Sequence, residues 1–135
     1  MYLLDSNACI ALIKNFPAAV RTRFDEEIAT GALMYVSSVV AFELWYGVAK
    51  SARRQINAHL VAQFLSEHVS LLPFESEDAE VAGSIRAALE AIGRPIGAYD
   101  ILIAGQALRR GLTLVTANVR EFSRIKGLKW EDWGK

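Results

Sequence analysis

The sequence has a single cysteine, Cys9, so no disulfide can form within the chain. It also lacks a run of eighteen apolar residues, which excludes a membrane-spanning helix. Met1 leads directly into the first predicted strand, without the basic and apolar regions of a secretion signal. Together these absences predict a protein of the reducing cytoplasm. The formal net charge is zero, which argues against binding nucleic acid through bulk charge.

Several common kinds of site are missing as well. There is no glycine-rich GxxxxGK[ST] or GxGxxG loop, so the sequence does not indicate a nucleotide cradle. Cys9, His59 and His68 do not show the spacing of zinc ligands. Ser6 has no evident histidine partner, which makes a nucleophilic triad improbable on sequence grounds. Internal repeats and low-complexity tracts are also absent.

What the sequence does contain is a regular alternation of short apolar runs and helical patterns. With 53% hydrophobic residues, the 135-residue chain is expected to fold as one domain, residues 1–135. The apolar runs lack the period-two pattern of half-exposed strands, which is typical of strands buried on both faces. The first helix is expected to be capped by Ser6 or Asn7, the helix after the third strand by Ser76, and a helix from about Ala98 to Arg110 is expected to end at Gly111. In the helix after Ser51, one apolar face is predicted from Ile56, Leu60, Val61, Phe64 and Leu65. Strands are predicted at 2–4, 33–37, 69–74 and 112–116, with an edge strand at 128–130. We therefore predict a three-layer α/β fold with a mostly parallel central sheet of four to five strands flanked by helices.

Acidic and amide residues occupy related places in this pattern. Asp5 ends the first strand, Glu43 lies early in the helix after the second strand, and Asp100 opens the helix before the fourth. Asn118 and Glu121 follow that fourth strand. Because strand carboxyl ends and the following helix N-termini share one edge of a parallel sheet, these side chains are expected to converge there.

Glu43 and Asp100 each interrupt an apolar helix. A buried carboxylate requires a cation, a set of hydrogen bonds or a raised pKa. Clustered carboxylates repel one another unless a divalent cation neutralises them, and oxygen ligands favour Mg²⁺ or Mn²⁺. Such a site suits phosphodiester hydrolysis. For each acid alone, a helix-dipole or surface role remains open.

Four short motifs resemble those of PIN-domain proteins, and of the VapC-type toxins of bacterial toxin–antitoxin modules among them. They are Asp5-Ser6-Asn7, Phe42-Glu43-Leu44-Trp45-Tyr46-Gly47, Pro95-Ile96-Gly97-Ala98-Tyr99-Asp100, and Thr116-Ala117-Asn118-Val119-Arg120-Glu121-Phe122. The resemblance covers essentially the whole chain. It implies an Mg²⁺- or Mn²⁺-dependent endoribonuclease with Asp5, Glu43 and Asp100 as metal ligands. Many similar proteins have Asp in place of Asn118, so the fourth position of the site falls to either Asn118 or Glu121.

The resemblance also implies partners. They are an RNA substrate, with initiator tRNA as the first candidate, a small VapB-type antitoxin that carries operator DNA binding, and a second copy of the chain in a homodimer. Ser6 and several basic residues are candidate RNA contacts. The basic candidates are Arg86, Arg94, Arg109, Arg110, Arg120, Arg124 and Lys126. Trp45 and Tyr46 are expected in the core, in the dimer interface or stacked on a base.

Three other functions are alternatives to the ribonuclease. A response-receiver domain needs an Asp at the end of the third strand, where this chain reads Leu-Leu-Pro-Phe. A phosphatase with an aspartate nucleophile needs an Asp-x-Asp pair, and position 7 is Asn. The third is a catalytically silent PIN-like module that binds RNA or regulates, which would follow if Asn118 disabled metal binding.

Overall fold

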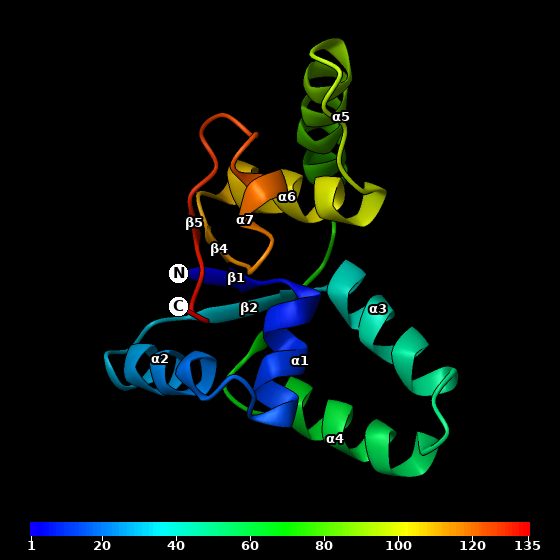
Figure 1. The fold of residues 1–135 in the computed structure, drawn as a ribbon, viewed down its shortest axis with the longest axis vertical. Helices are drawn as coiled ribbons and strands as arrows, with labels where there is room; N and C mark the ends of the chain where they lie inside the picture. The colour runs from blue at the N-terminus through cyan, green and yellow to red at the C-terminus, as the bar shows by residue number, and fades with distance from the viewer.

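The computed structural model describes residues 1–135 and contains five strands and seven helices (Figure 1). The strands are β1 (Tyr2–Leu4), β2 (Met34–Ser37), β3 (Ser70–Leu72), β4 (Thr113–Val115) and β5 (Trp130–Glu131). The helices are α1 (Ser6–Lys14), α2 (Ala18–Ala29), α3 (Ser38–Ala49), α4 (Arg54–Ser66), α5 (Ser76–Ala91), α6 (Ala98–Arg110) and α7 (Val119–Phe122). No helix is both long and apolar enough to cross a membrane.

All five strands are parallel, in the order β3-β2-β1-β4-β5. The predicted α/β class and the parallel sheet are therefore confirmed. In β1, Leu4 is paired with Val36 of β2 and Val115 of β4. The next residue of each strand, Asp5, Ser37 and Thr116, thus lies at the same carboxyl edge of the sheet. This edge is the one from which α1 and α3 leave in Figure 1.

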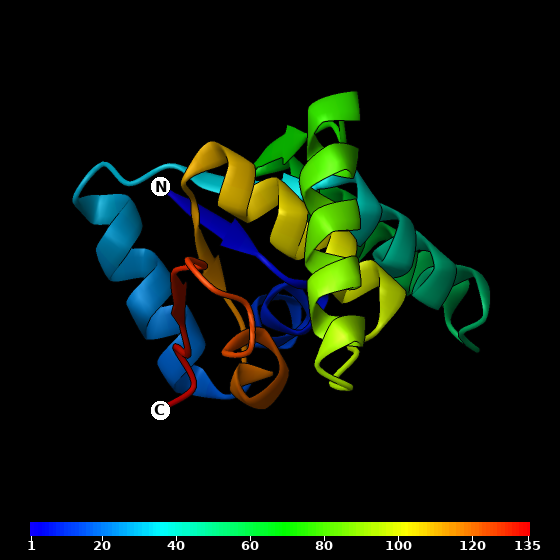
Figure 2. The same cartoon turned by 90° about the horizontal axis from the view of Figure 1, so that it is seen from above.

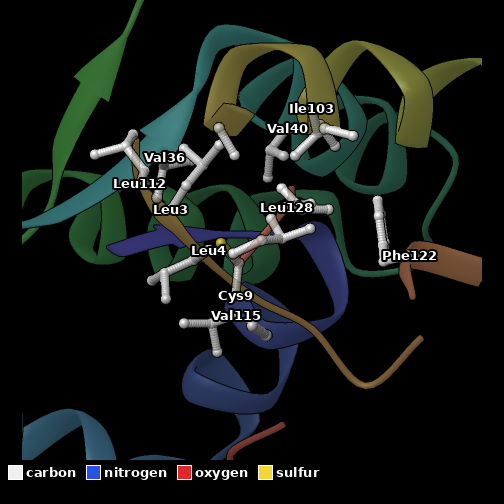
Figure 3. Close-up of a cluster of buried hydrophobic side chains, with 14 of the residues drawn as sticks. Leu3, Leu4, Cys9, Val36, Val40, Ile103, Leu112, Val115, Phe122 and Leu128 are labelled. Atoms are coloured by element: carbon white, nitrogen blue, oxygen red, sulfur yellow. The ribbon is translucent and has the colours of Figure 1, made fainter. Parts of the chain in front are cut away.

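Helices cover both faces of the sheet. In Figures 1 and 2, α5 and α6 lie on one side and α1, α2 and α4 on the other. A cluster of 27 buried apolar residues fills the space between these layers. Figure 3 shows its centre, where Leu3 and Leu4 of β1 lie between Ile103 of α6 and Cys9 of α1. Burial on both faces explains the continuous apolar runs of the strands.

One predicted helix face is only partly buried. The spacing of Ile56, Leu60, Val61 and Phe64 predicted a stripe directed at the core, and α4 does bury Val61. However, Ile56 is 58% exposed and Leu60 is 39% exposed. The prediction was therefore wrong for the N-terminal half of this stripe, where Ile56 is mostly exposed and Leu60 lies at the rim of a hollow beside Ile13 and Leu44.

Helices α5 and α6 cross at very close range. A Cβ placed on Gly105 of α6 would lie 2.7 Å from the Cβ of Ala82 in α5, so only glycine fits this crossing. The pair is further fixed by Asp78, whose side chain is fully buried and accepts hydrogen bonds from Arg109 and Arg110. Ser76 was predicted to cap α5. Instead Glu75 is the N-cap and forms a capping box with Asp78.

Candidate active site

Asp5 lies at the junction of β1 and α1. The sequence suggested Ser6 or Asn7 as the N-cap of this helix, but the cap is Asp5 itself, whose Oδ1 accepts the Ala8 N–H at 2.8 Å. Asp5 is only 4% exposed. Burial raises its pKa from 3.8 to about 6, hydrogen bonds from Thr116 and the Ala8 N–H oppose that rise, and the nearby charge of Asp100 adds to it. The helix cap and the functional role therefore do not exclude each other.

Thr116 begins the fourth motif, but the sequence did not predict a role for it. Its side chain is buried, its hydroxyl accepts the Asn118 N–H at 2.9 Å, and by donating a hydrogen bond to the Asp5 carboxylate it lowers the pKa of Asp5. Thr116 follows β4 as Asp5 follows β1, in neighbouring parallel strands of known register. The matching places of Asp5 and Thr116, each directly after a buried apolar run, are the signal by which the sequence could have identified Thr116.

Glu43 approaches the same edge from α3, within the second turn after the Ser37 cap. Its Oε1 atom is buried and has no hydrogen-bond partner. Burial is the main cause that raises the pKa of Glu43, and the charges of Asp100 and Asp5 raise it further. Glu43 thus lies in electrostatic reach of both aspartates.

Asp100, Asn118 and Glu121 form the other side of the site. The Asn118 amide nitrogen donates to Glu121 Oε2 at 3.1 Å and to Asp100 Oδ2 at 3.4 Å. Asp100 is half-buried, and its pKa is raised by burial first and by the Glu121 charge second. Asn118 therefore bridges two carboxylates, with its amide hydrogens between two like charges. We call Asp5, Glu43, Asp100 and Glu121 the acidic edge.

No lysine or arginine forms an ion pair with any residue of the acidic edge. The carboxylates are also not drawn together into a preformed set of three ligands. The acids repel one another, since the charges of Asp5, Asp100 and Glu121 each raise the pKa of another acid of the edge. Buried oxygens without a cation, one of them without any partner, fit a hard divalent ion such as Mg²⁺ or Mn²⁺. Such an ion would have Asp5, Glu43 and Asp100 as its candidate ligands, with Glu121 as a further acid of the edge.

The basic residues proposed as RNA contacts divide into two groups. Arg109 and Arg110 bind Glu75 and Asp78, so the structure assigns these two to the α5–α6 contact. Arg86 pairs with Glu90, and Arg124 donates to the Pro95 carbonyl. Side chains without any hydrogen bond or ion pair are those of Arg94, Arg120 and Lys126.

Two hollows flank the acidic edge. The larger, about 570 Å³, lies between α1, α3 and the start of α6, and its lining includes Ser6, Glu43 and Tyr99. Ser6 therefore faces a cleft beside the acids, as a contact to substrate requires. The second hollow, about 370 Å³, adjoins the first at Ile10 of α1 and includes Ala8 and Thr116.

The parallel sheet of this α/β fold carries carboxylates at its carboxyl edge, and no basic residue neutralises them. These two features define a class of enzymes that cleave phosphodiesters with the help of a bound cation. Residues 2–128 match the model of the PIN domain family. The chain is 44% identical over 132 residues to the tRNA(fMet)-specific endonuclease VapC of Shigella flexneri, covering 98% of this chain and 97% of that protein.

Solved structures agree with this match. VapBC2 of Rickettsia felis, bound to a DNA fragment from its promoter, superposes with a TM-score of 0.91 at 35% identity, covering 98% of both chains. DNA-bound VapBC of Salmonella typhimurium gives 0.89 at 42% identity, covering 98% of this chain and 97% of that one. The chain belongs to the PIN domain family and, within it, to the VapC ribonucleases. Nucleases of this group generally depend on a divalent metal.

Proposed function

We propose that this chain is the toxin of a VapBC-type toxin–antitoxin module and that it cleaves initiator tRNA with Mg²⁺ or Mn²⁺ bound by Asp5, Glu43 and Asp100. The observation that carries the proposal is the acidic edge, four carboxylates on one side of the sheet without a cationic partner. The 44% identity to a VapC that is specific for tRNA(fMet) supports the choice of substrate. We propose further that the 135 residues form one domain, which the single buried cluster supports.

The residues of the chain have distinct parts in this reaction. When bound, a divalent cation polarises the phosphate and makes water a nucleophile near neutral pH. Asp5 is held in place by the Ala8 N–H and Thr116, so its carboxylate is aimed before substrate arrives. Glu43 approaches from α3 and Asp100 from α6, and the charge of Asp100 acts on both Glu43 and Asp5. Glu121 supplies the acid at the fourth position, next to the neutral amide of Asn118.

The test compares cleavage of initiator tRNA and of an elongator tRNA by wild type and by Asp100→Asn, with added Mg²⁺ or with chelator. Wild type should cut initiator tRNA and the variant should not. The loss should exceed the roughly 10–100-fold that changes around metal ligands cost. Asp100 is half-exposed, so the variant should keep its fold. Cleavage that survives both the substitution and the chelator would refute the metal-dependent mechanism.

We propose that the antitoxin covers the apolar surface between α1, α3 and α4. A hollow of about 230 Å³ there is lined by Ile10, Leu44, Leu60 and Val61 and reaches Glu43. The exposed half of the α4 stripe belongs to this surface. Both structures described above are toxin–antitoxin complexes on DNA. On this proposal operator DNA is bound through the antitoxin alone, because this chain has no net positive charge.

We propose a homodimer that uses the exposed aromatic residues of α3. Phe42, Trp45 and Tyr46 are 54%, 41% and 58% exposed, which is a large apolar surface for one helix. Sedimentation of wild type should show a dimer, and Trp45→Glu should shift it to monomer. Ile92→Glu, at an exposed apolar position beyond α5, is the control. A wild type that sediments as a monomer at tens of micromolar, about the range where weak interfaces fill, would contradict the dimer.

A further inference from the structure

The acidic edge alone gives no role to the hollow of about 370 Å³ that is lined by Ala8 and Thr116. We call it the tail pocket, because the last residues of the chain form one wall. Its other walls are the outer face of α1, the segment that leads into α2, and the end of β4. In Figure 2 the C-terminal segment runs beside α2, with α1 seen end-on next to them. The volume lies at the lower end of the roughly 300–1,000 Å³ typical of small-ligand pockets, which suits one planar ring system.

The tail pocket is continuous with the acidic edge. Ala8 and Thr116 belong to its lining, and these two residues also hold the Asp5 carboxylate. A group bound in the pocket would therefore be separated from Asp5 by a single layer of residues. The larger cleft at Ser6 and Tyr99 adjoins the pocket, because Ile10 of α1 lines both hollows. An RNA strand that crosses the acidic edge can thus place one neighbour of the cut phosphate in each hollow.

The chemistry of the walls suits a nucleobase. Val20 and Trp133 provide a buried apolar floor, and Phe16 stands at the rim with its ring 77% exposed. Nothing in the chain stacks on Phe16, so one face of an aromatic ring is available to a base. Lys14, also in the lining, has no ion-pair partner and can meet a backbone phosphate.

Polar groups in the pocket favour a base that carries an exocyclic amino group. Asp132 uses Oδ1 to accept the Gly134 N–H at 2.9 Å, and its second oxygen has no partner. That oxygen can accept a hydrogen bond from an exocyclic amino group, as acidic side chains do from cytosine. Uracil has no such group. Asn7, exposed and without a side-chain hydrogen bond, adds a second adaptable contact.

We propose that the tail pocket binds one unpaired nucleobase of the RNA substrate, a base with an exocyclic amino group, and thereby fixes where the strand is cut. This inference rests on the proposed ribonuclease function and adds a specificity subsite to it. A segment of antitoxin is the competing occupant. The apolar surface between α1, α3 and α4 already offers a polypeptide its place, whereas the tail pocket includes the unpaired polar side chains of Asn7 and Asp132, which the hollow in that surface lacks.

The experiment uses hairpin RNAs with randomised loops, sequenced after partial cleavage by the full chain. Wild type should favour adenine, cytosine or guanine over uracil at one position next to the cut. Phe16→Ala should lower kcat/KM about ten- to hundredfold, the range for loss of one base stack, and weaken that preference. Asp132→Asn keeps the acceptor for Gly134 but offers an N–H donor to the base, so uracil should become acceptable at that position.

Matched controls lie away from the pocket. Leu33→Ala removes a side chain that is 53% exposed before β2, and Asp25→Asn changes an exposed acid on α2. Both should cleave like wild type. Cleavage by Phe16→Ala and Asp132→Asn with unchanged kcat/KM and base preference would overturn the pocket but not the nuclease. No cleavage by wild type would overturn both. Weaker antitoxin binding by Phe16→Ala with unchanged cleavage would assign the pocket to a polypeptide and also overturn the inference.

Discussion

Replacing Asp5 by Asn should stabilise the metal-free protein near neutral pH. The pKa of Asp5 is raised from 3.8 to about 6, mainly because burial disfavours its ionised form. At ~1.36 kcal/mol per pKa unit, this difference corresponds to about 3 kcal/mol. Asn retains an oxygen that can accept the Ala8 N–H at 2.8 Å, so the cap of α1 is preserved. Only the buried charge is removed.

The direction of the pH dependence follows from proton binding. Between pH 3.8 and about 6, folded Asp5 holds its proton more often than unfolded Asp5 does. The contribution of Asp5 to stability is therefore fully present below the lower value and is lost as pH rises towards the upper one. The free energy of unfolding of Asp5→Asn minus that of wild type should thus be near zero at about pH 4. It should rise to about 2–3 kcal/mol above pH 6.

Urea unfolding of metal-free wild type and Asp5→Asn across pH 4–8 measures this difference directly, and the subtraction removes the contributions of other titrating groups. Added Mg²⁺ should stabilise wild type above pH 6, because a ligand that binds only the folded state adds stability. It should have less effect on the variant. A variant that is less stable than wild type at pH 7.5, or a difference that does not change with pH, would refute the account of Asp5 as a buried, unneutralised acid.

Two further predictions concern the site and the fold. Glu121→Gln should raise the Mg²⁺ concentration needed for half-maximal cleavage. Asn118→Asp should leave that concentration unchanged or lower it, because a carboxylate adds charge that an amide lacks. An unchanged midpoint in Glu121→Gln, together with lost activity in Asn118→Ala, would give the fourth role to Asn118 instead. Gly105→Ala should destabilise the protein by about 1–3 kcal/mol through the clash with Ala82. Gly83→Ala, whose new Cβ meets nothing within 4 Å, should instead stabilise the protein by up to about 1 kcal/mol. Equal urea midpoints for the two variants would contradict the close crossing of α5 and α6.

The parts of the fold that sequence could predict are those set by local chemistry. Helix α6 was predicted from about Ala98 to Arg110 with Gly111 as its end, and the structure has those bounds. Gly111 adopts φ of +66°, a conformation that glycine reaches without strain, so the helix end is encoded by one residue. Strand positions were predicted for a similar reason, because a short apolar run between two turns is typical of a strand that is buried on both faces of a parallel sheet.

The parts that could not be predicted depend on what lies opposite a residue. The spacing of Ile56 and Leu60 matches Val61 and Phe64, yet only the second pair meets the rest of the chain. A helical period reveals a stripe, not how far the neighbouring layer extends along it. In the site, the alternation of strands and helices predicted which edge carries the acids. It did not reveal that the Asn118 amide lies between Asp100 and Glu121, because that contact depends on side-chain rotamers.

Two nearly fully buried aspartates show what sequence leaves open about function. Asp78 and Asp5 both occur near the start of a helix, where an acid suits the helix dipole. Burial opposes ionisation of both, but hydrogen bonds from Arg109, the Glu75 N–H and Arg110 leave the pKa of Asp78 lowered. The pKa of Asp5 is raised, because no cation of the chain reaches it. The fold neutralises one buried carboxylate with two arginines and leaves the other beside further acids, and this contrast supports the proposal that Asp5 binds a cation from solution.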